Sequence, residues 1–148
     1  MLNMKTNKAK LTFSKLVEIQ GVAALLNNLG FKSTKQRAAV LSALHSYKGP
    51  MTAEKIVAKT GIDLATVYRT LESFDKVGLI NKFNLKNSSF FYEIKSEHHH
   101  HIVCNHCGYI EEVEVCNVNK VVPLTKKFST ITEHSLEFFG ICKSCAKS

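Results

Sequence analysis

The chain has 148 residues, of which 45% are hydrophobic and 22% charged, which is the balance of an ordinary globular protein. No apolar run approaches the roughly 18 residues that span a bilayer, and residues 1–10 lack the apolar stretch of a secretory signal. Membrane and secreted proteins are therefore disfavoured, and a cytoplasmic location is expected.

The formal charge of +8 is concentrated in the first part of the chain. Residues 1–90 contain 14 Lys/Arg and 5 Asp/Glu, whereas residues 91–148 contain 6 and 7. A basic half attracts nucleic acid or an acidic membrane surface. No segment has the basic and bulky apolar faces of a helix that lies on a membrane, so nucleic acid is the favoured partner.

The spacing of apolar residues predicts two helices before residue 50. The first is expected over 13–29, with Gly30 as its C-terminal cap. The second begins after Ser33 or Thr34, either of which can cap it, and ends at Gly49-Pro50.

Two further helices are delimited by caps and glycines. Thr52 starts a short helix that Gly61 stops, and Asp63 caps a fourth that ends at Gly78. Residues 79–85 and 89–94 then resemble the strands of a hairpin around 86–88. This order of elements predicts a winged helix-turn-helix.

The character of the chain changes near residue 94. A strand is expected over 109–115, a helix over 118–128 that Pro123 interrupts or begins, and strand structure over 129–140. The predicted fold class is α+β, with an N-terminal winged-helix domain (1–94, of which 1–12 is flexible) and a small second domain (95–148).

Four of the five cysteines form two Cys-x-x-Cys pairs: Cys104, Cys107, Cys142 and Cys145. Two such turns can place four sulfurs around one Zn²⁺, and a complete Cys₄ shell indicates a structural zinc ion. The alternatives are a redox pair, which leaves the second pair unexplained, and four unrelated buried thiols. Cys116 stands outside the pattern, and we interpret it as a small buried residue rather than a metal ligand.

Residues 98–101 are four consecutive histidines. In an extended segment His99 and His101 point one way and His98 and His100 the other, so the run predicts two sites rather than one. Glu93, Glu112 and His134 supply further donors, a set that suits Zn²⁺, Fe²⁺, Mn²⁺ or Ni²⁺. The alternative is a solvated histidine-rich loop.

Several segments together resemble the ferric uptake regulator family, in order from about residue 30 to 145. They are Ser33 to Arg37, Thr52-Ala53-Glu54, Ala65 to Leu71, Gly78-Leu79-Ile80, His98 to Cys104, Cys107-Gly108, His134 to Glu137 and Gly140-Ile141-Cys142. The resemblance implies a homodimeric, metal-responsive transcriptional repressor, not an enzyme, that binds a palindromic DNA operator. It also implies that the second domain is an α/β zinc-binding dimerisation domain.

The resemblance carries over to individual residues. It implies DNA contacts from Tyr68 and Arg69 in the recognition helix and from Lys32 in the minor groove, with Arg37 and Thr66 in the same matching segments. It implies a regulatory divalent metal, Fe²⁺, Zn²⁺ or Mn²⁺, bound by four residues: Glu93, His99, His101 and Glu112. It implies an additional metal site at His98, His100 and His134, with an acidic residue that the sequence does not locate.

The chain departs from the family pattern at two positions. Many members have a histidine ligand just before Thr52-Ala53-Glu54, where this chain has Gly49-Pro50-Met51, and zinc-sensing relatives often have a cysteine near Ile94. The sequence therefore does not determine which metal regulates the protein. A peroxide-sensing repressor that oxidises a histidine ligand is the alternative on the same fold, and a metallohydrolase is a remote third.

Overall fold

The computed structural model describes residues 13–47, 49–85, 89–96, 98–116, 120, 122–132 and 134–147. The chain forms two compact units, residues 1–96 (the N-terminal unit) and 97–148 (the C-terminal unit). The expected flexibility of residues 1–12 and the hairpin turn at 86–88 lie outside the described residues. No described helix is both long and apolar enough to cross a membrane.

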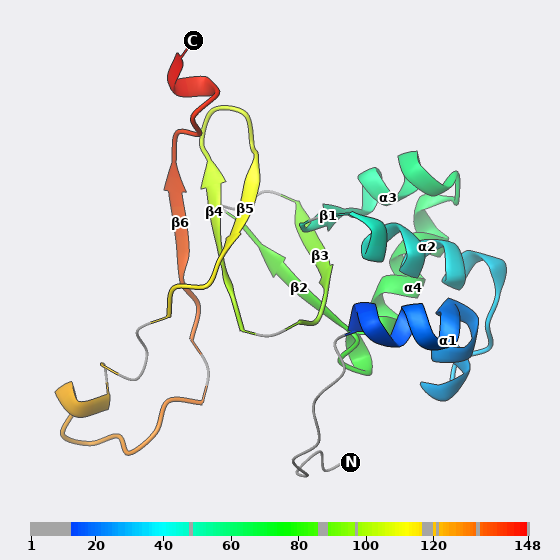
Figure 1. The fold of residues 1–148 in the computed structure, drawn as a ribbon, viewed down its shortest axis with the longest axis horizontal. Coiled ribbons are helices and arrows are strands. Elements are labelled where there is room, and N and C mark those ends of the chain that lie inside the picture. Colours follow the sequence, from blue (N-terminus) through cyan, green and yellow to red (C-terminus); the bar gives the residue numbers. More distant parts are fainter. Residues whose placement is uncertain are drawn as a thin grey trace. The chain divides into compact units, whose positions relative to one another are not determined.

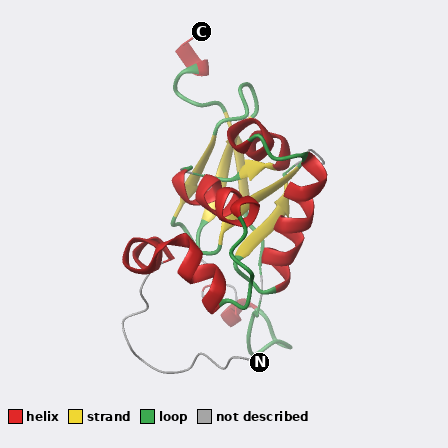
Figure 2. Ribbon diagram, turned by 90° about the vertical axis from the view of Figure 1, so that its right-hand side faces the viewer, coloured by secondary structure: helices red, strands yellow, loops and turns green. Residues whose placement is uncertain are grey.

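The N-terminal unit consists of a helical bundle and a small antiparallel sheet (Figures 1 and 2). Its elements are α1 (Phe13–Asn28), α2 (Lys35–Ser46), β1 (Met51–Thr52), α3 (Ala53–Thr60), α4 (Leu64–Lys76), β2 (Ile80–Asn84) and β3 (Phe90–Ile94). The strand order is β1-β3-β2. This is a winged helix-turn-helix in which β2 and β3 form the wing.

Local chemistry explains where three of these helices begin. The hydroxyls of Thr34 and Thr52 accept hydrogen bonds from the main-chain N–H groups of Arg37 and Lys55, each at 3.3 Å. Asp63 Oδ1 accepts from Thr66 N at 2.9 Å at the start of α4. Each cap satisfies one of the N–H groups that a helix leaves without a partner in its first turn.

The first helix differs from the expected continuous helix. Gly21 has φ 75° and ψ 159°, so α1 is broken at this residue. A left-handed φ is a conformation that glycine adopts without steric cost. After the break, Leu25 and Leu26 are buried, whereas Leu29 is 37% exposed.

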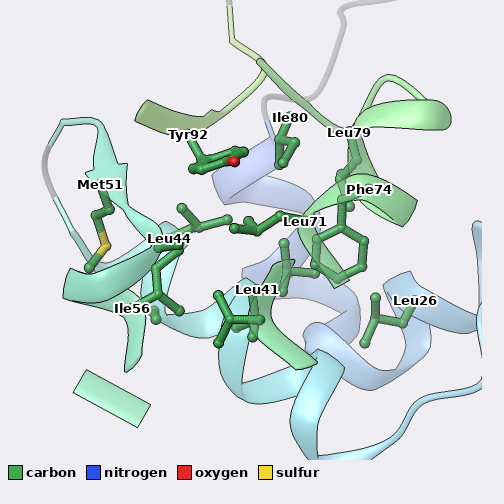
Figure 3. Close-up of a cluster of buried hydrophobic side chains, with 14 residues drawn as sticks. Leu26, Leu41, Leu44, Met51, Ile56, Leu71, Phe74, Leu79, Ile80 and Tyr92 are labelled. Carbon is green, nitrogen blue, oxygen red and sulfur yellow. The ribbon is translucent and has the colours of Figure 1, made fainter. Parts of the chain in front are cut away.

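A single apolar core holds the N-terminal unit together (Figure 3). Val67, Leu71 and Phe74 from α4 are fully buried and pack with Leu41 of α2 and Ile56 of α3. Met51 of β1 also enters this core, opposite Tyr92 of β3. The core fixes α4 by its buried face and leaves its other face to solvent.

The C-terminal unit is built on a second three-stranded sheet. Its elements are β4 (His100–Cys104), β5 (Ile110–Val113), a 3₁₀ turn (Val122–Leu124), β6 (Glu137–Gly140) and a second 3₁₀ turn (Cys145–Lys147). Strand β4 lies between β5, which is antiparallel to it, and β6, which is parallel (Figure 1). The parallel register places Cys104 opposite Gly140.

Three sequence expectations for this unit are wrong in extent. The described part of the expected helix 118–128 contains only the 3₁₀ turn at Val122–Leu124, where Pro123 lacks the N–H that an α-helix needs; residues 117–119 and 121 lie outside the described chain. Strand structure expected over 129–140 is limited to β6, and β5 is shorter than the expected 109–115.

Candidate metal centres and nucleic-acid interface

The two Cys-x-x-Cys turns meet at one end of the second sheet. Ligand atoms of Cys104, Cys107, Cys142 and Cys145 all lie within 4.8 Å of one another. The sulfurs of Cys107 and Cys142 are 3.7 Å apart. Four sulfurs at about 2.3 Å from a tetrahedral Zn²⁺ have edges of about 3.8 Å, so the cluster has the dimensions of a closed zinc site.

Main-chain groups favour a negative charge on this cluster. The N–H groups of Cys107 and Cys142 are directed at Cys104 and lower the pKa of its thiol to about 6; the contact from Cys142 N is 3.3 Å long. By contrast, the sulfurs of Cys142 and Cys107 raise the pKa of Cys145 to about 12. A negative charge on Cys104 therefore disfavours one on Cys145, and a cation such as Zn²⁺ would offset that repulsion.

A second cluster contains three imidazoles and one thiol. The Nε2 atoms of His98 and His100 are 3.0 Å apart, and those of His100 and His134 are 3.3 Å apart. Cys116 Sγ lies 3.3 Å from His134 Nε2. Burial, followed by the neighbouring His98 and His134, lowers the pKa of His100, so this ring is held in the neutral form that can bind a metal.

A third cluster lies across β4 and β5. The rings of His99 and His101 meet edge to face with centroids 4.9 Å apart. His101 pairs with Glu112 in the register of the two strands, and the ligand atoms of the two histidines and Glu112 lie within 4.8 Å of one another. The histidine run thus alternates, with His98 beside His100 and His99 beside His101, so that two separate donor sets form.

Glu93 lies on β3 in the N-terminal unit. Its side chain is 7% exposed, and its Oε1 accepts a hydrogen bond of 3.3 Å from Asn81 Nδ2 on the neighbouring strand β2. A buried carboxylate is unusual unless it is paired or binds a cation. Met51, one of the three residues that stand where many family members have a histidine ligand, is buried in the core.

The exposed face of α4 carries the residues expected to contact DNA. Tyr68 is 38% exposed, and its hydroxyl donates to Glu54 Oε1 at 3.4 Å. Burial, and then the charge of Glu54, raises the pKa of Tyr68, so the phenol stays a donor. Arg69 is exposed, and its Nη2 donates to Thr66 Oγ1 at 3.2 Å.

Lys32 and Arg37 lie at the start of α2. Lys32 is exposed, and its carbonyl accepts a 3.2 Å hydrogen bond from Arg37 Nη1. The Arg37 guanidinium also lies 5.4 Å from the centroid of the Phe31 ring. These contacts orient the Arg37 guanidinium, while the Lys32 side chain extends from the same unit, where the excess of positive charge lies.

Sequence reasoning missed the position of Cys116. The expected small buried residue is instead exposed and lies beside His134. No local pattern places it there, because His134 is 18 residues further along the chain. His106, in contrast, is exposed, as its place inside a Cys-x-x-Cys turn predicts.

A winged helix joined to a unit with thiolate and imidazole clusters defines a metal-responsive DNA-binding regulator. The family model of the ferric uptake regulator family matches residues 28–139. The chain therefore belongs to the ferric uptake regulator family, a family of transcriptional regulators.

Individual relatives agree with this membership. The peroxide-responsive repressor PerR of Staphylococcus aureus is 29% identical over 135 residues, which cover 86% of this chain and 91% of that protein. The Helicobacter pylori ferric uptake regulator Fur, described as having three functional metal binding sites, is 27% identical with a TM-score of 0.74, covering 95% and 99% of the two chains. The Campylobacter jejuni peroxide stress regulator is 26% identical with a TM-score of 0.61, covering 86% and 98%.

Proposed function

We propose that this protein is a cytoplasmic, metal-dependent repressor of genes for metal uptake or homeostasis, and that it binds palindromic operators as a homodimer. One observation carries the proposal: a metal-ligand set, His99, His101 and Glu112, follows directly on a winged helix whose recognition helix is exposed. A DNA-binding domain alone would have no need of such a set.

The DNA-binding residues are assigned from the exposed face of α4. Arg69 contacts guanine or phosphate, and the Tyr68 ring packs against thymine methyl groups in the major groove. Thr66, which accepts from Arg69, orients the guanidinium. Lys32 and Arg37 contact the backbone or minor groove beside α2.

The metal ligands are assigned by donor chemistry. Cys104, Cys107, Cys142 and Cys145 hold structural Zn²⁺. His99, His101 and Glu112, with Glu93 from six residues before His99, hold the regulatory divalent ion, Fe²⁺, Zn²⁺ or Mn²⁺. His98, His100 and His134 form an additional site.

The homodimer is supported by the surface of the C-terminal unit. Among its described residues, Tyr109, Val115, Phe128 and Ile141 are each more than half exposed, and Leu124 is 83% exposed. So many large apolar side chains on a small unit are typical of a surface that a second copy covers. In a dimer the two α4 helices would contact two half-sites one helical turn apart.

The mechanism follows from where the ligands lie in the chain. Glu93 belongs to the last strand of the wing, whereas His99, His101 and Glu112 belong to the C-terminal unit. Ligands from both units would bind the ion together only in one arrangement of the units. A shift from mostly open to mostly closed needs about 5 kcal/mol of preference for that arrangement.

The proposal is tested with operator duplexes selected from random DNA in the presence of Mn²⁺. Wild-type protein is expected to bind them more tightly with metal, whereas His99→Ala and His101→Ala bind weakly with or without it. His106→Ala, which removes an exposed imidazole outside all three clusters, is the matched control and should respond as wild type. Equal metal response in all four proteins would contradict the assignment.

Peroxide sensing is the second candidate, and the similarity to peroxide-responsive regulators from two organisms favours considering it. In that case His99 or His101 would gain one oxygen when the Fe²⁺-loaded protein meets peroxide. Mass spectrometry of the peptide that contains residues 98–101 decides between the two. An unmodified peptide together with metal-dependent DNA binding would exclude peroxide sensing and favour metal sensing.

A further inference from the structure

The exposed thiol of Cys116 lies beside the cluster of His98, His100 and His134. Its sulfur is 3.3 Å from His134 Nε2, and the four ligand atoms all lie within 4.8 Å of one another. Cys116 follows β5, whereas His134 precedes β6. Two separate segments of the chain therefore bring a thiol to a group of imidazoles.

The dimensions of this cluster match a tetrahedral cage. An ion with nitrogen ligands at about 2.0–2.1 Å and a sulfur ligand at about 2.3 Å has nitrogen–nitrogen edges of about 3.3 Å and nitrogen–sulfur edges of about 3.6 Å. The nitrogen–nitrogen separations are 3.0 and 3.3 Å, and the sulfur lies 3.3 Å from nitrogen. A small shift of each side chain would admit an ion at the centre.

Hydrogen bonding among the rings is a poorer explanation of the same geometry. An imidazole Nε2 carries either one proton or one lone pair, yet His100 Nε2 faces both His98 and His134. His100 also forms a hydrogen bond with the main chain at Leu136, and Nδ1 of His100 is the ring atom left for that bond. This is the arrangement in which a histidine directs its Nε2 lone pair at a metal.

We propose that the Cys116 thiolate is the fourth ligand of a His₃Cys metal site, where a carboxylate was expected, and that the site selects Zn²⁺ over Mn²⁺. The thiol releases its proton to solvent as the sulfur binds the ion. Thiolate is a soft ligand that suits Zn²⁺ and is a poor one for Mn²⁺. The proposal rests on the proposed additional metal site, but not on the regulatory site or on DNA binding.

The first experiment uses Co²⁺ as a spectroscopic probe in full-length protein purified with one zinc per chain. Thiolate-bound Co²⁺ has a near-ultraviolet charge-transfer band, and tetrahedral Co²⁺ has visible bands whatever its ligands. Wild-type protein is expected to show both on titration. Cys116→Asp should keep visible bands but lose the charge-transfer band, with the zinc count unchanged.

The same variants measure metal selectivity. Cys116→Asp should bind Zn²⁺ at least about 10- to 100-fold more weakly, because changing a residue that only supports a ligand already has an effect of that size. Its affinity for Mn²⁺ should not fall in parallel. Cobalt binding to wild type without a charge-transfer band, an unchanged band in Cys116→Asp, or no cobalt binding would each overturn the proposal.

Alkylation of Cys116 is a second measurement. Unlike the cobalt spectrum, it reports on Cys116 alone, even if the added ion also binds at another site. One added equivalent of Zn²⁺ should slow iodoacetamide labelling of Cys116, mapped by mass spectrometry, in wild type. The same slowing is expected in the control His45→Ala, whose histidine lies on α2 and in none of the three clusters. Zn²⁺ should not slow labelling in His134→Ala, which lacks a ligand. Equal labelling with and without Zn²⁺ in wild type would contradict the proposal, while leaving metal-dependent operator binding untouched.

Discussion

The two units of this protein are stabilised by different physics. The N-terminal unit has a core of fourteen buried residues, which come from four helices, three strands and, with Leu79, the turn between α4 and β2. In the described part of the C-terminal unit, Cys104 is the one buried residue that counts as apolar, and His100 and His101 are the buried polar ones. The first unit therefore folds by apolar burial, whereas the second depends on its ligand clusters.

The largest expected effect is that of removing the Cys₄ zinc. Cys107→Ser should lose zinc and the ordered structure of residues 98–147, because structural zinc contributes on the order of 10–16 kcal/mol. Hydrogen exchange followed by mass spectrometry should show lost protection in β4, β5 and β6 but retained protection in α2 and α4. His106→Ala, which changes an exposed residue outside all three clusters, is the control and should keep the Cys₄ zinc and the protection.

Persistent protection of the C-terminal sheet in zinc-free Cys107→Ser would contradict the dependence of this unit on zinc. It would mean that packing between copies or within the sheet holds the unit without its ion.

The reverse experiment weakens the apolar core. Leu71→Ala removes a fully buried side chain of α4 and should lower the free energy of unfolding of the N-terminal unit by about 2–5 kcal/mol. Urea denaturation measures the change, and zinc content should stay at the wild-type value. Val77→Ala, at a half-exposed site in the same unit, should change stability far less; a loss of zinc in Leu71→Ala would show that the two units are not independent.

The third prediction concerns DNA rather than folding. Arg69→Ala should weaken operator binding by about 1–3 kcal/mol if Arg69 contacts a base, and should leave zinc content unchanged. Fluorescence anisotropy with a selected operator measures this. Lys76→Ala removes one positive charge from the C-terminal end of α4 and should weaken binding less. Equal losses in the two variants would show that Arg69 acts only through its charge.

The smallest effect is expected at the cap of α4. Hydrogen bonds from the hydroxyl and then the main-chain N–H of Thr66 lower the pKa of Asp63. The pKa of Asp63 is therefore lower in the folded state than in the unfolded state. The stabilisation by the Asp63 carboxylate is complete above the unfolded-state pKa and is lost as the pH falls through the folded-state pKa. The difference in Tm between wild type and Asp63→Ala should therefore shrink towards low pH, whereas a difference that is constant with pH would exclude the ionised cap.

Local signals explain which parts of the fold could be predicted from the sequence. Thr34, Thr52 and Asp63 cap helices where expected, since a cap involves only the next few residues. The strand β1 could not be predicted, because two residues become a strand only by pairing with β3 some forty positions later. The break at Gly21 was missed because a glycine inside a helical pattern is usually tolerated.

The same distinction holds for the candidate sites. The Cys₄ set could be predicted because its cysteines form two Cys-x-x-Cys pairs in the sequence. The alternation of the histidines could be predicted because successive side chains of an extended backbone point in opposite directions. Cys116 carries no such signal, since only the folded C-terminal unit brings it to His134.

Control of DNA binding by a regulatory metal is tested by comparing two binding isotherms, one with the metal and one without it. Operator affinity is determined on a single preparation with the regulatory metal bound, and again after mild chelation that leaves one zinc per chain by elemental analysis. We expect affinity to fall by about 5- to 150-fold, the usual range of coupling between two sites. Identical affinities at the same zinc content would contradict the account.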